Sequence, residues 1–231
     1  MKKVKKSKII CLPESELTPI KEDFRKTFQW RVFRIMAEFV DGFQFIADFQ
    51  KSVAIFGSSR TPKNDRYYKE AFKLGKLLAK EGYAVITGGG PGIMEAANKG
   101  AFEAGGESVG INIQLPEGES KNRYVKNSIG FHYFFTRKVM LSYACYGYVF
   151  FPGGFGTLDE FFEMITLIQT KKIDQKITVV VVGKEYWQPL VSWIESELLI
   201  KRKAIKENDL KIFQIVDSAQ EAFSIIKQNI S

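Results

Sequence analysis

The sequence predicts an α/β fold in which a parallel sheet is covered by helices on both faces, and three observations lead to this prediction. Apolar, β-branched runs alternate with amphipathic helical patterns along most of the chain. Some runs, such as "KITVVVVGK" (176–184), are apolar almost throughout, as strands buried on both faces are. Three of the runs end in glycine-rich turns. Together these features are typical of a doubly wound, Rossmann-like sheet.

An N-terminal helical extension precedes this predicted domain. The first eight residues contain five lysines, a pattern typical of a solvated basic tail. From Phe24 to Phe49 the apolar side chains recur at nearly helical spacing, and Gly42 is a point at which this helix can break. We therefore predict two parts, a basic tail with a helical extension in residues 1–50 and the Rossmann-like domain in residues 51–231.

Each element of the predicted domain follows from its local pattern. The first strand and turn, "KSVAIFGSSR", precedes an amphipathic helix that Gly82 closes. The polar stretch "EGESKNRYVKN" (117–127) is expected to run over the surface, and Ser218 with Glu221 has capping-box spacing at the start of the last helix. The predicted strands with their turns are residues 51–60, 83–92, 107–116, 128–135, 146–151, 176–184 and 211–216. The predicted helices are residues 67–82, 93–106, 136–145, 157–170, 186–202 and 217–230.

The composition restricts the classes of partner and site. The formal net charge is +8, but outside the tail Lys and Arg are mixed with acids and no basic helix appears, so no nucleic-acid partner is expected. The sequence contains no apolar run of about twenty residues and no apolar signal-peptide core, so we expect no membrane partner and a cytoplasmic location. Cys11, Cys145 and the single histidine, His132, lack zinc-binding spacing, so we predict no metal and no cofactor.

The three glycine-rich turns form the predicted ligand site. They are Gly57 to Ser59, Gly88 to Gly92 and Gly153 to Thr157, each directly after an apolar run. Ligands of doubly wound sheets bind beyond the carboxyl ends of the strands, where the strand order reverses. A helix that starts at such a turn attracts phosphate or carboxylate through its unpaired N–H groups and its dipole. Because neither the G-x-x-x-x-G-K-[ST] loop nor the G-x-G-x-x-G fingerprint is present, we expect a small phosphorylated ligand, such as a mononucleotide, instead of ATP or NAD.

Glu160 and Arg137 are the candidate catalytic groups, and each has a second interpretation. Thr157 and Glu160 have the spacing of a capping box, in which the glutamate bonds the first N–H groups of the helix, and spacing alone favours this interpretation over catalysis. Arg137 is either a surface charge at a helix start or a planar donor for phosphate or carboxylate.

Two motifs give the chain a family resemblance. "PGGFGTLDE" (152–160) has the pattern P-G-G-x-G-T-x-x-E, and "TRK" (136–138) lies upstream. Together they resemble the LOG (Lonely Guy) family of cytokinin riboside 5′-monophosphate phosphoribohydrolases and related bacterial AMP-cleaving proteins, which were once labelled lysine decarboxylases. The resemblance runs from about Ser52 to Ile173. It implies an enzyme that hydrolyses the N-glycosidic bond of a purine nucleoside 5′-monophosphate, releasing free base and ribose 5-phosphate.

The resemblance also implies roles for individual residues. Arg137 and Glu160 match the catalytic pair of the family, and this reverses the preference for Glu160 as a cap. Glu95 is an acid that plain LOG members usually lack at this position, so the choice between a cytokinin nucleotide and AMP stays open. The candidate residues for binding substrate and its phosphate are Ser58, Gly89, Gly90, Gly92, Glu95, Lys138, Gly153, Gly154, Gly156 and Thr157, with a structural role as the alternative for Lys138.

Other hypotheses remain beside the hydrolase. A non-catalytic nucleotide-binding or sensing protein would use the same phosphate cradle. The decarboxylase label gains no support, because the sequence singles out no lysine for the Schiff base that pyridoxal phosphate requires. The family resemblance further implies that the protein forms a homodimer. It also implies that the small molecule bound by the protein is a nucleoside monophosphate.

Overall fold

The computed structural model describes residues 23–114, 121–174 and 176–229. The chain forms two compact units, one ending at Ala37 and the other beginning at Glu38, whereas the sequence predicts a boundary after residue 50. The boundary falls within helix α1 (Phe28–Ala47), so the C-terminal half of this helix belongs to the larger unit. In the smaller unit, a short 3₁₀ helix, η2 (Phe24–Lys26), precedes α1. The basic tail and Cys11 lie outside the described residues.

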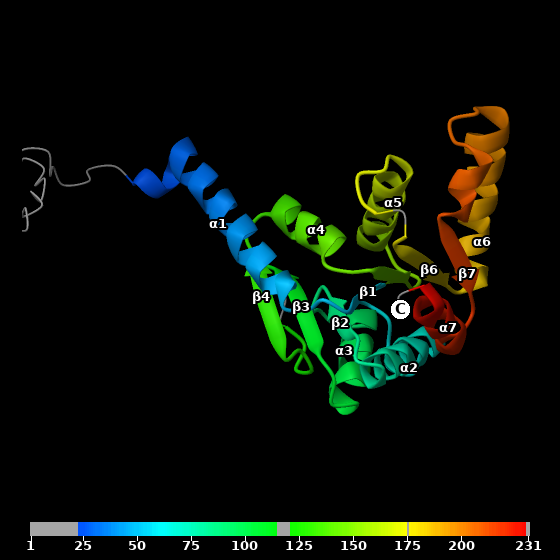
Figure 1. The fold of residues 1–231 in the computed structure, drawn as a ribbon, viewed down its shortest axis with the longest axis horizontal. Helices are drawn as coiled ribbons and strands as arrows, with labels where there is room; N and C mark the ends of the chain where they lie inside the picture. Colours follow the sequence, from blue (N-terminus) through cyan, green and yellow to red (C-terminus); the bar gives the residue numbers. More distant parts are fainter. Residues whose placement is uncertain (1–22, 115–120, 175, 230–231) are drawn as a thin grey trace, which may run out of the picture. The chain divides into compact units, whose positions relative to one another are not determined.

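The described residues of the larger unit form a sheet of seven parallel strands in the order β4-β3-β2-β1-β5-β6-β7 (Figure 1). Every neighbouring pair of these strands is parallel, and helices connect most of them, so the predicted fold class is confirmed. The strands are β1 (Ser52–Phe56), β2 (Ala84–Thr87), β3 (Ser108–Ile113), β4 (Asn127–Phe131), β5 (Gly147–Phe150), β6 (Thr178–Val182) and β7 (Phe213–Val216).

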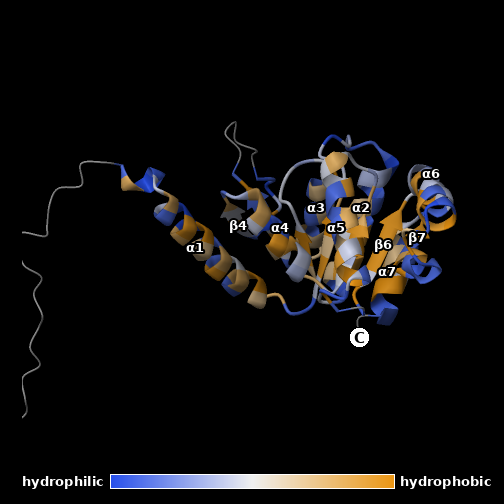
Figure 2. Cartoon of the chain, turned by 90° about the horizontal axis from the view of Figure 1, so that it is seen from above, coloured by the Kyte–Doolittle hydropathy of each residue, from blue (hydrophilic) through white to orange (hydrophobic). Residues whose placement is uncertain are grey.

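Helices cover both faces of the sheet. One face packs against α2, α3 and α7, and the other packs against α4, α5 and α6 (Figure 1). Figure 2 shows the apolar strand β6 between helices whose outer surfaces are more hydrophilic. The helices are α2 (Arg66–Lys80), α3 (Ile93–Glu103), α4 (Phe134–Tyr143), α5 (Phe155–Gln169), α6 (Lys184–Trp193) and α7 (Ala219–Asn229), with a π-helical continuation of α6, η3 (Ile194–Lys201), and a 3₁₀ helix, η4 (Glu207–Lys211).

The central strands have almost entirely apolar sequences because both of their faces are buried. In β1, Val53 and Ile55 face the layer of α2 and α3, whereas Ala54 and Phe56 belong to the opposite core. Phe56 stacks on Phe150 of β5, with ring centroids 5.0 Å apart. Removing such side chains from water is the main favourable contribution to folding, so the apolar runs specify the centre of the sheet.

The strand order reverses between β1 and β5. The chain runs outward from β1 through β2 and β3 to β4, and then returns to place β5 on the other side of β1. The connections after β1 and β5 therefore leave in opposite directions and open a crevice at the carboxyl ends of these two strands. This crevice is where the first and third predicted glycine turns lie.

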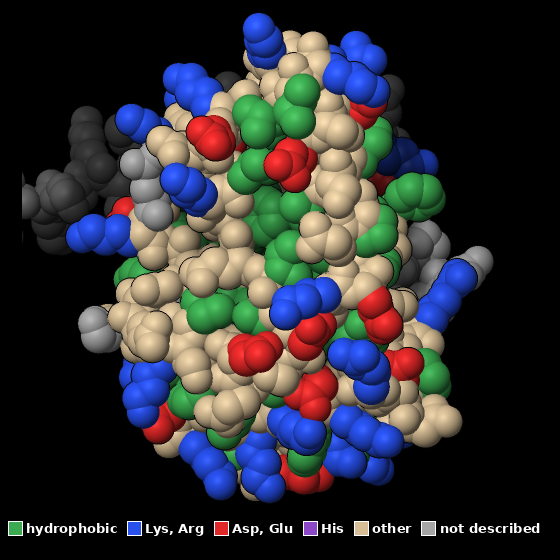
Figure 3. Space-filling view, turned by 90° about the vertical axis from the view of Figure 1, so that its right-hand side faces the viewer, with side chains coloured by type: hydrophobic (Ala, Val, Ile, Leu, Met, Phe, Trp, Pro, Cys, Tyr) green, Lys and Arg blue, Asp and Glu red, His purple; other side chains and the backbone are tan. Residues whose placement is uncertain are grey.

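The described surface carries charges of both signs (Figure 3). On the face toward which α6 and β7 lie, Figure 3 shows Lys and Arg side chains interspersed with Asp and Glu, unlike the continuous basic groove that follows a nucleic-acid backbone. Within residues 23–114, 121–174 and 176–229, no helix has both the length and the apolar character that crossing a bilayer requires.

Candidate active site

A cavity of about 490 Å³ lies at the carboxyl ends of β1 and β5, within the size range of small-molecule sites. It brings together six of the predicted site residues, Arg137, Glu160, Ser58, Gly154, Gly156 and Thr157. Its other lining residues among those described are Phe56, Gly57, Ser59, Arg60, Gly88, Met94, Ile113, Phe134 and Phe155. The cavity is therefore at the reversal of strand order, as the doubly wound fold predicts.

The three glycine turns are hydrogen-bonded to one another through Ser58. Its N–H donates to the carbonyl of Pro152, and its carbonyl accepts from the N–H of Ile93, each at 3.0 Å. Gly92, at φ +67°, lies directly against the backbone of Ser58 and Ser59, where a side chain would collide. Gly92 thus serves the contact between two turns and is not among the described residues that line the cavity.

Helix α5 starts at the cavity and corrects the predicted capping box. The helix begins at Phe155 and its N-cap is Gly154, which has no side chain, so Thr157 lies inside the first turn and cannot be the capping residue. The first intrahelical bond runs from the N–H of Leu158 to the carbonyl of Gly154, at 3.1 Å. The N–H groups of Phe155, Gly156 and Thr157 precede that bond and are available to an anion in the cavity.

Glu160 lies in the wall of the cavity, one turn into α5. Its side chain is buried, with 6% of the residue exposed. Burial raises the pKa of Glu160 to about 8, and the negative charge of Glu163 acts in the same direction, whereas Arg137 and Lys138 lower the pKa. A carboxyl group with a pKa near neutrality can both donate and accept a proton at physiological pH, which suits a general acid or base.

Arg137 reaches the cavity from α4. Its Nε donates a hydrogen bond to the carbonyl of Ile111 in β3, at 2.8 Å. The guanidinium also lies against Gly88, where a Cβ atom would come within 2.5 Å of Nη2. The close approach explains why the turn after β2 contributes a glycine to the cavity.

Lys138, a predicted binding residue, is not among the described residues that line the cavity. Its ammonium group lies 2.6 Å from Oδ2 of Asp159 and 3.3 Å from Oε2 of Glu163. Although burial opposes its charge, these acids hold the pKa of Lys138 above its ordinary value. The lysine therefore connects α4 to α5, as its structural interpretation expects.

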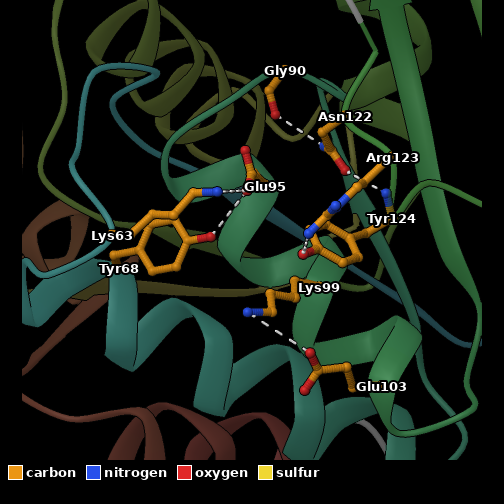
Figure 4. Close-up of polar contacts among 9 residues, drawn as sticks. All are labelled: Lys63, Tyr68, Gly90, Glu95, Lys99, Glu103, Asn122, Arg123 and Tyr124. Atoms are coloured by element: carbon orange, nitrogen blue, oxygen red, sulfur yellow. Dashed lines mark hydrogen bonds and ion pairs between the residues drawn. The ribbon is translucent and has the colours of Figure 1, made fainter.

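Glu95, Gly89 and Gly90 are likewise not among the described residues that line the cavity. The carboxylate of Glu95 accepts a hydrogen bond from Tyr68, at 3.3 Å, and pairs with Lys63, at 3.0 Å (Figure 4). It is thus directed toward α2 and the loop before it. Gly153 also lies outside the described lining; its carbonyl accepts from Tyr186, at 2.7 Å.

The turn after β2 is held by a buried polar network that contains Asn122. This residue belongs to the polar stretch expected on the surface, yet it is 7% exposed. Its amide donates to the carbonyl of Gly90, at 2.9 Å (Figure 4). It also donates to the carbonyl of Gly89, at 3.0 Å, and to Oδ1 of Asn98. Asn98 is fully buried and also accepts from the hydroxyl of Thr87. Its role is structural.

Several cavity residues were not predicted. Arg60 adds a second cation from the turn after β1, and its position directly after "GSS" is the only local signal for it. Phe134 and Met94 provide apolar surface, with no motif that distinguishes them from other apolar residues. Among the described residues, no group of three or more His, Cys, Asp and Glu is arranged to hold a metal ion. A second cavity, of about 480 Å³, lies at the amino end of β6, away from Arg137 and Glu160.

Comparison with known proteins identifies the family. A family model described as "Possible lysine decarboxylase" matches residues 94–226, which is more than half of the chain and includes Arg137 and Glu160. The chain belongs to this family, the LOG family. Despite the description of the LOG family model, no lysine is found among the described residues that line the cavity, although pyridoxal phosphate chemistry requires one.

Relatives in the LOG family are named hydrolases. The chain is 28% identical to the cytokinin riboside 5′-monophosphate phosphoribohydrolase of Rhodococcoides fascians over 151 residues, which are 63% of this chain and 74% of that protein. It is 26% identical to a protein of the same name from Arabidopsis thaliana over 186 residues, covering 77% and 82% of the two chains. The molybdenum cofactor carrier protein of Chlamydomonas reinhardtii has a TM-score of 0.60 at 22% identity, covering 78% of this chain and 97% of that chain, and so shares the fold.

Proposed function

We propose that the protein hydrolyses the N-glycosidic bond of purine nucleoside 5′-monophosphates, with adenine or cytokinin-type bases, and releases free base and ribose 5-phosphate. The observation that carries the proposal is the buried Glu160 beside the start of α5, in the same cavity as Arg137. The names of the LOG relatives support the same reaction class.

The substrate would be held at its phosphate and at its base. The first N–H groups of α5 provide an anion site strengthened by the helix dipole, and Arg60 adds a positive charge to the same cavity. The apolar side chains of Met94, Ile113 and Phe134 offer a surface for a purine. This arrangement favours a nucleotide with a single phosphate and a planar base.

Glu160 would act first as the general acid and then as the general base of the reaction. Cleavage of the bond between the base nitrogen and C1′ leaves positive charge on the ribose, as in other glycosyl transfers. The protonated carboxyl group donates its proton to the departing base, and the resulting carboxylate stabilises the cationic sugar. The carboxylate then takes a proton from the water that bonds to C1′, which restores the starting state. Arg137 anchors substrate oxygens or polarises the base through its guanidinium.

The test is release of free base and ribose 5-phosphate from AMP and from isopentenyladenosine monophosphate. We expect turnover by the wild type and a loss of at least about 100-fold in Glu160→Gln, the lower end of the usual contribution of an acid or base. Glu103→Gln, an exposed change on α3, is the matched control and should retain activity. The better substrate decides between cytokinin and AMP.

Binding without turnover would contradict the hydrolase. If either nucleotide binds to the cavity of the folded wild type but neither is cleaved, the protein is a non-catalytic nucleotide-binding or sensing protein. Glu160→Gln would then alter affinity without an activity to lose.

We also propose that the protein forms a homodimer. Support comes from large apolar side chains exposed on α4 and on the adjoining half of α1, including Phe43, Phe134, Phe135 and Tyr143. Light scattering coupled to size-exclusion chromatography tests this, and a mass equal to the single chain at micromolar concentration would contradict it.

A further inference from the structure

A carboxylate from the N-terminal helix α1 binds the start of α4. Oε1 of Glu38 accepts a hydrogen bond from the backbone N–H of His132, at 2.8 Å. Oε2 accepts from the backbone N–H of Tyr133, at 3.3 Å, and from the hydroxyl of Thr136, at 2.5 Å. These donors are contributed by a segment almost a hundred residues later in the chain.

The carboxylate lies where α4 begins, at Phe134 after its N-cap, Tyr133. Among the described residues, the side chain of its N-cap, Tyr133, makes no capping hydrogen bond. The first N–H groups of a helix require partners, and its N-terminus carries partial positive charge that a carboxylate neutralises. Glu38 accepts from the N–H groups of the N-cap, Tyr133, and of the residue before it, and from the hydroxyl of Thr136 in the first turn, so its carboxylate holds the chain where it enters α4.

The same half of α1 packs closely against α4 one turn further along. Gly42 is buried, and a Cβ atom there would lie 2.6 Å from the sulfur of Met140 and 3.1 Å from the ring of Phe131. Glycine thus permits a helix contact that any larger residue would push apart. Glu38 and Gly42 together fix the position of α4 from the side of α1.

The hydrogen bond between Glu38 and Tyr133 is connected to Arg137 through the backbone of α4. The carbonyl of Tyr133, whose N–H donates to Glu38, accepts a hydrogen bond from the N–H of Arg137, at 3.3 Å. The hydroxyl oxygen of Thr136 lies 2.7 Å from the same carbonyl and 2.5 Å from Oε2 of Glu38, so its single hydrogen is shared between these two acceptors. The first turn of α4 is therefore a hydrogen-bonded unit with Glu38 at one end and the arginine at the other.

We propose that Glu38 is a positioning residue for Arg137, so that α1 is part of the active-site scaffold; the catalytic consequence rests on the proposed hydrolase function. Glu38 lies outside residues 94–226, which the family model matches, and therefore represents a feature of this chain beyond that shared region. Misplacing a reacting group by about 1 Å can lower a rate about 100-fold, so even a small movement of the guanidinium should be measurable.

The kinetic test compares Glu38→Ala, Glu38→Gln and a control, Asp41→Ala, an exposed change on the same helix. We expect Glu38→Ala to lower kcat about tenfold or more with a smaller change in KM, and Glu38→Gln to fall between it and the wild type, because the amide keeps one accepting oxygen. Thr136→Val should lower kcat in the wild type but have little further effect in Glu38→Ala, since the bond that it removes is one of the three that Glu38→Ala already removes.

A second readout does not depend on turnover. The Nε–H resonance of Arg137, assigned by its loss in Arg137→Lys, reports the bond to Ile111. We expect this resonance to shift in Glu38→Ala, and the amides of His132 and Tyr133 to exchange about fivefold to tenfold faster, the effect of losing a hydrogen bond worth about 1 kcal/mol. Asp41→Ala should leave both unchanged.

The outcomes separate the two proposals. An inactive wild type would contradict the hydrolase, while the resonance and the exchange rates would still decide whether Glu38 positions Arg137. Unchanged kcat, resonance and exchange in a folded Glu38→Ala protein would overturn the positioning role. If Glu38→Ala fails to fold, Glu38→Gln and Thr136→Val provide the same decision.

Discussion

Replacing Glu160 by glutamine should stabilise the folded protein, and more strongly at alkaline than at acidic pH. Burial raises the pKa of Glu160 to about 8 from the ordinary 4.5. Between these values the folded protein keeps a proton that the unfolded chain has lost, so stability falls as the pH rises from about 4.5 to about 8. At 1.36 kcal/mol per pH unit over about 3.5 units, the penalty reaches about 5 kcal/mol as an upper bound. Glutamine cannot ionise and removes this penalty.

Urea unfolding of the wild type and Glu160→Gln at pH 5 and pH 9 measures the effect. Contributions from other titrating groups are common to both proteins and cancel in the difference between them. We expect Glu160→Gln to gain several kcal/mol relative to the wild type between the two pH values, and the exposed control Glu103→Gln to gain almost nothing. The same difference in unfolding free energy at both pH values would refute the raised pKa and, with it, the acid–base role of Glu160.

Two further predictions follow from the surroundings of Glu160. Lys138→Met removes a positive charge that lowers the pKa of Glu160, so the pH profile of turnover should move to higher pH by about one unit. Glu163→Gln removes a negative charge that raises this pKa, so the profile should move to lower pH by about one unit. Shifts of both variants in the same direction would contradict the effect of these two charges on Glu160. Gly88→Ala should lower turnover about tenfold or more with little change in melting temperature, because the new methyl group displaces Arg137; unaltered turnover would show that the guanidinium tolerates the movement.

Most of the fold was predictable because its determinants are local. The run "KITVVVVGK" predicts a strand buried on both faces, and β6 is buried throughout. The predicted cap of the last helix is confirmed, since Ser218 and Glu221 exchange the expected hydrogen bonds, at 3.2 Å each. These features depend on residues within a few positions of one another.

The site was predictable only in part, since its remaining determinants are long-range. The glycine motif correctly indicates a turn at the cavity, but the capping box is wrong because α5 starts earlier, at a glycine. Tertiary packing brings Lys138 of α4 to Asp159 of α5, and it brings Asn122 to the carbonyl of Gly89 in the turn after β2. The carboxylate of Glu38 lies too far along the sequence from Arg137 for any spacing rule to connect them.

The two hydrogen bonds of Ser58 have a consequence for redesigning the substrate preference of this site. They join the turns after β1, β2 and β5 through backbone groups that only a substitution by proline removes. An altered turn will therefore shift its neighbours, and substitutions in different turns should show interaction energies instead of simple additivity. A mutant library that varies all three turns together should therefore include combinations that successive rounds of mutagenesis on one turn would miss. The three turns should therefore be varied and selected together.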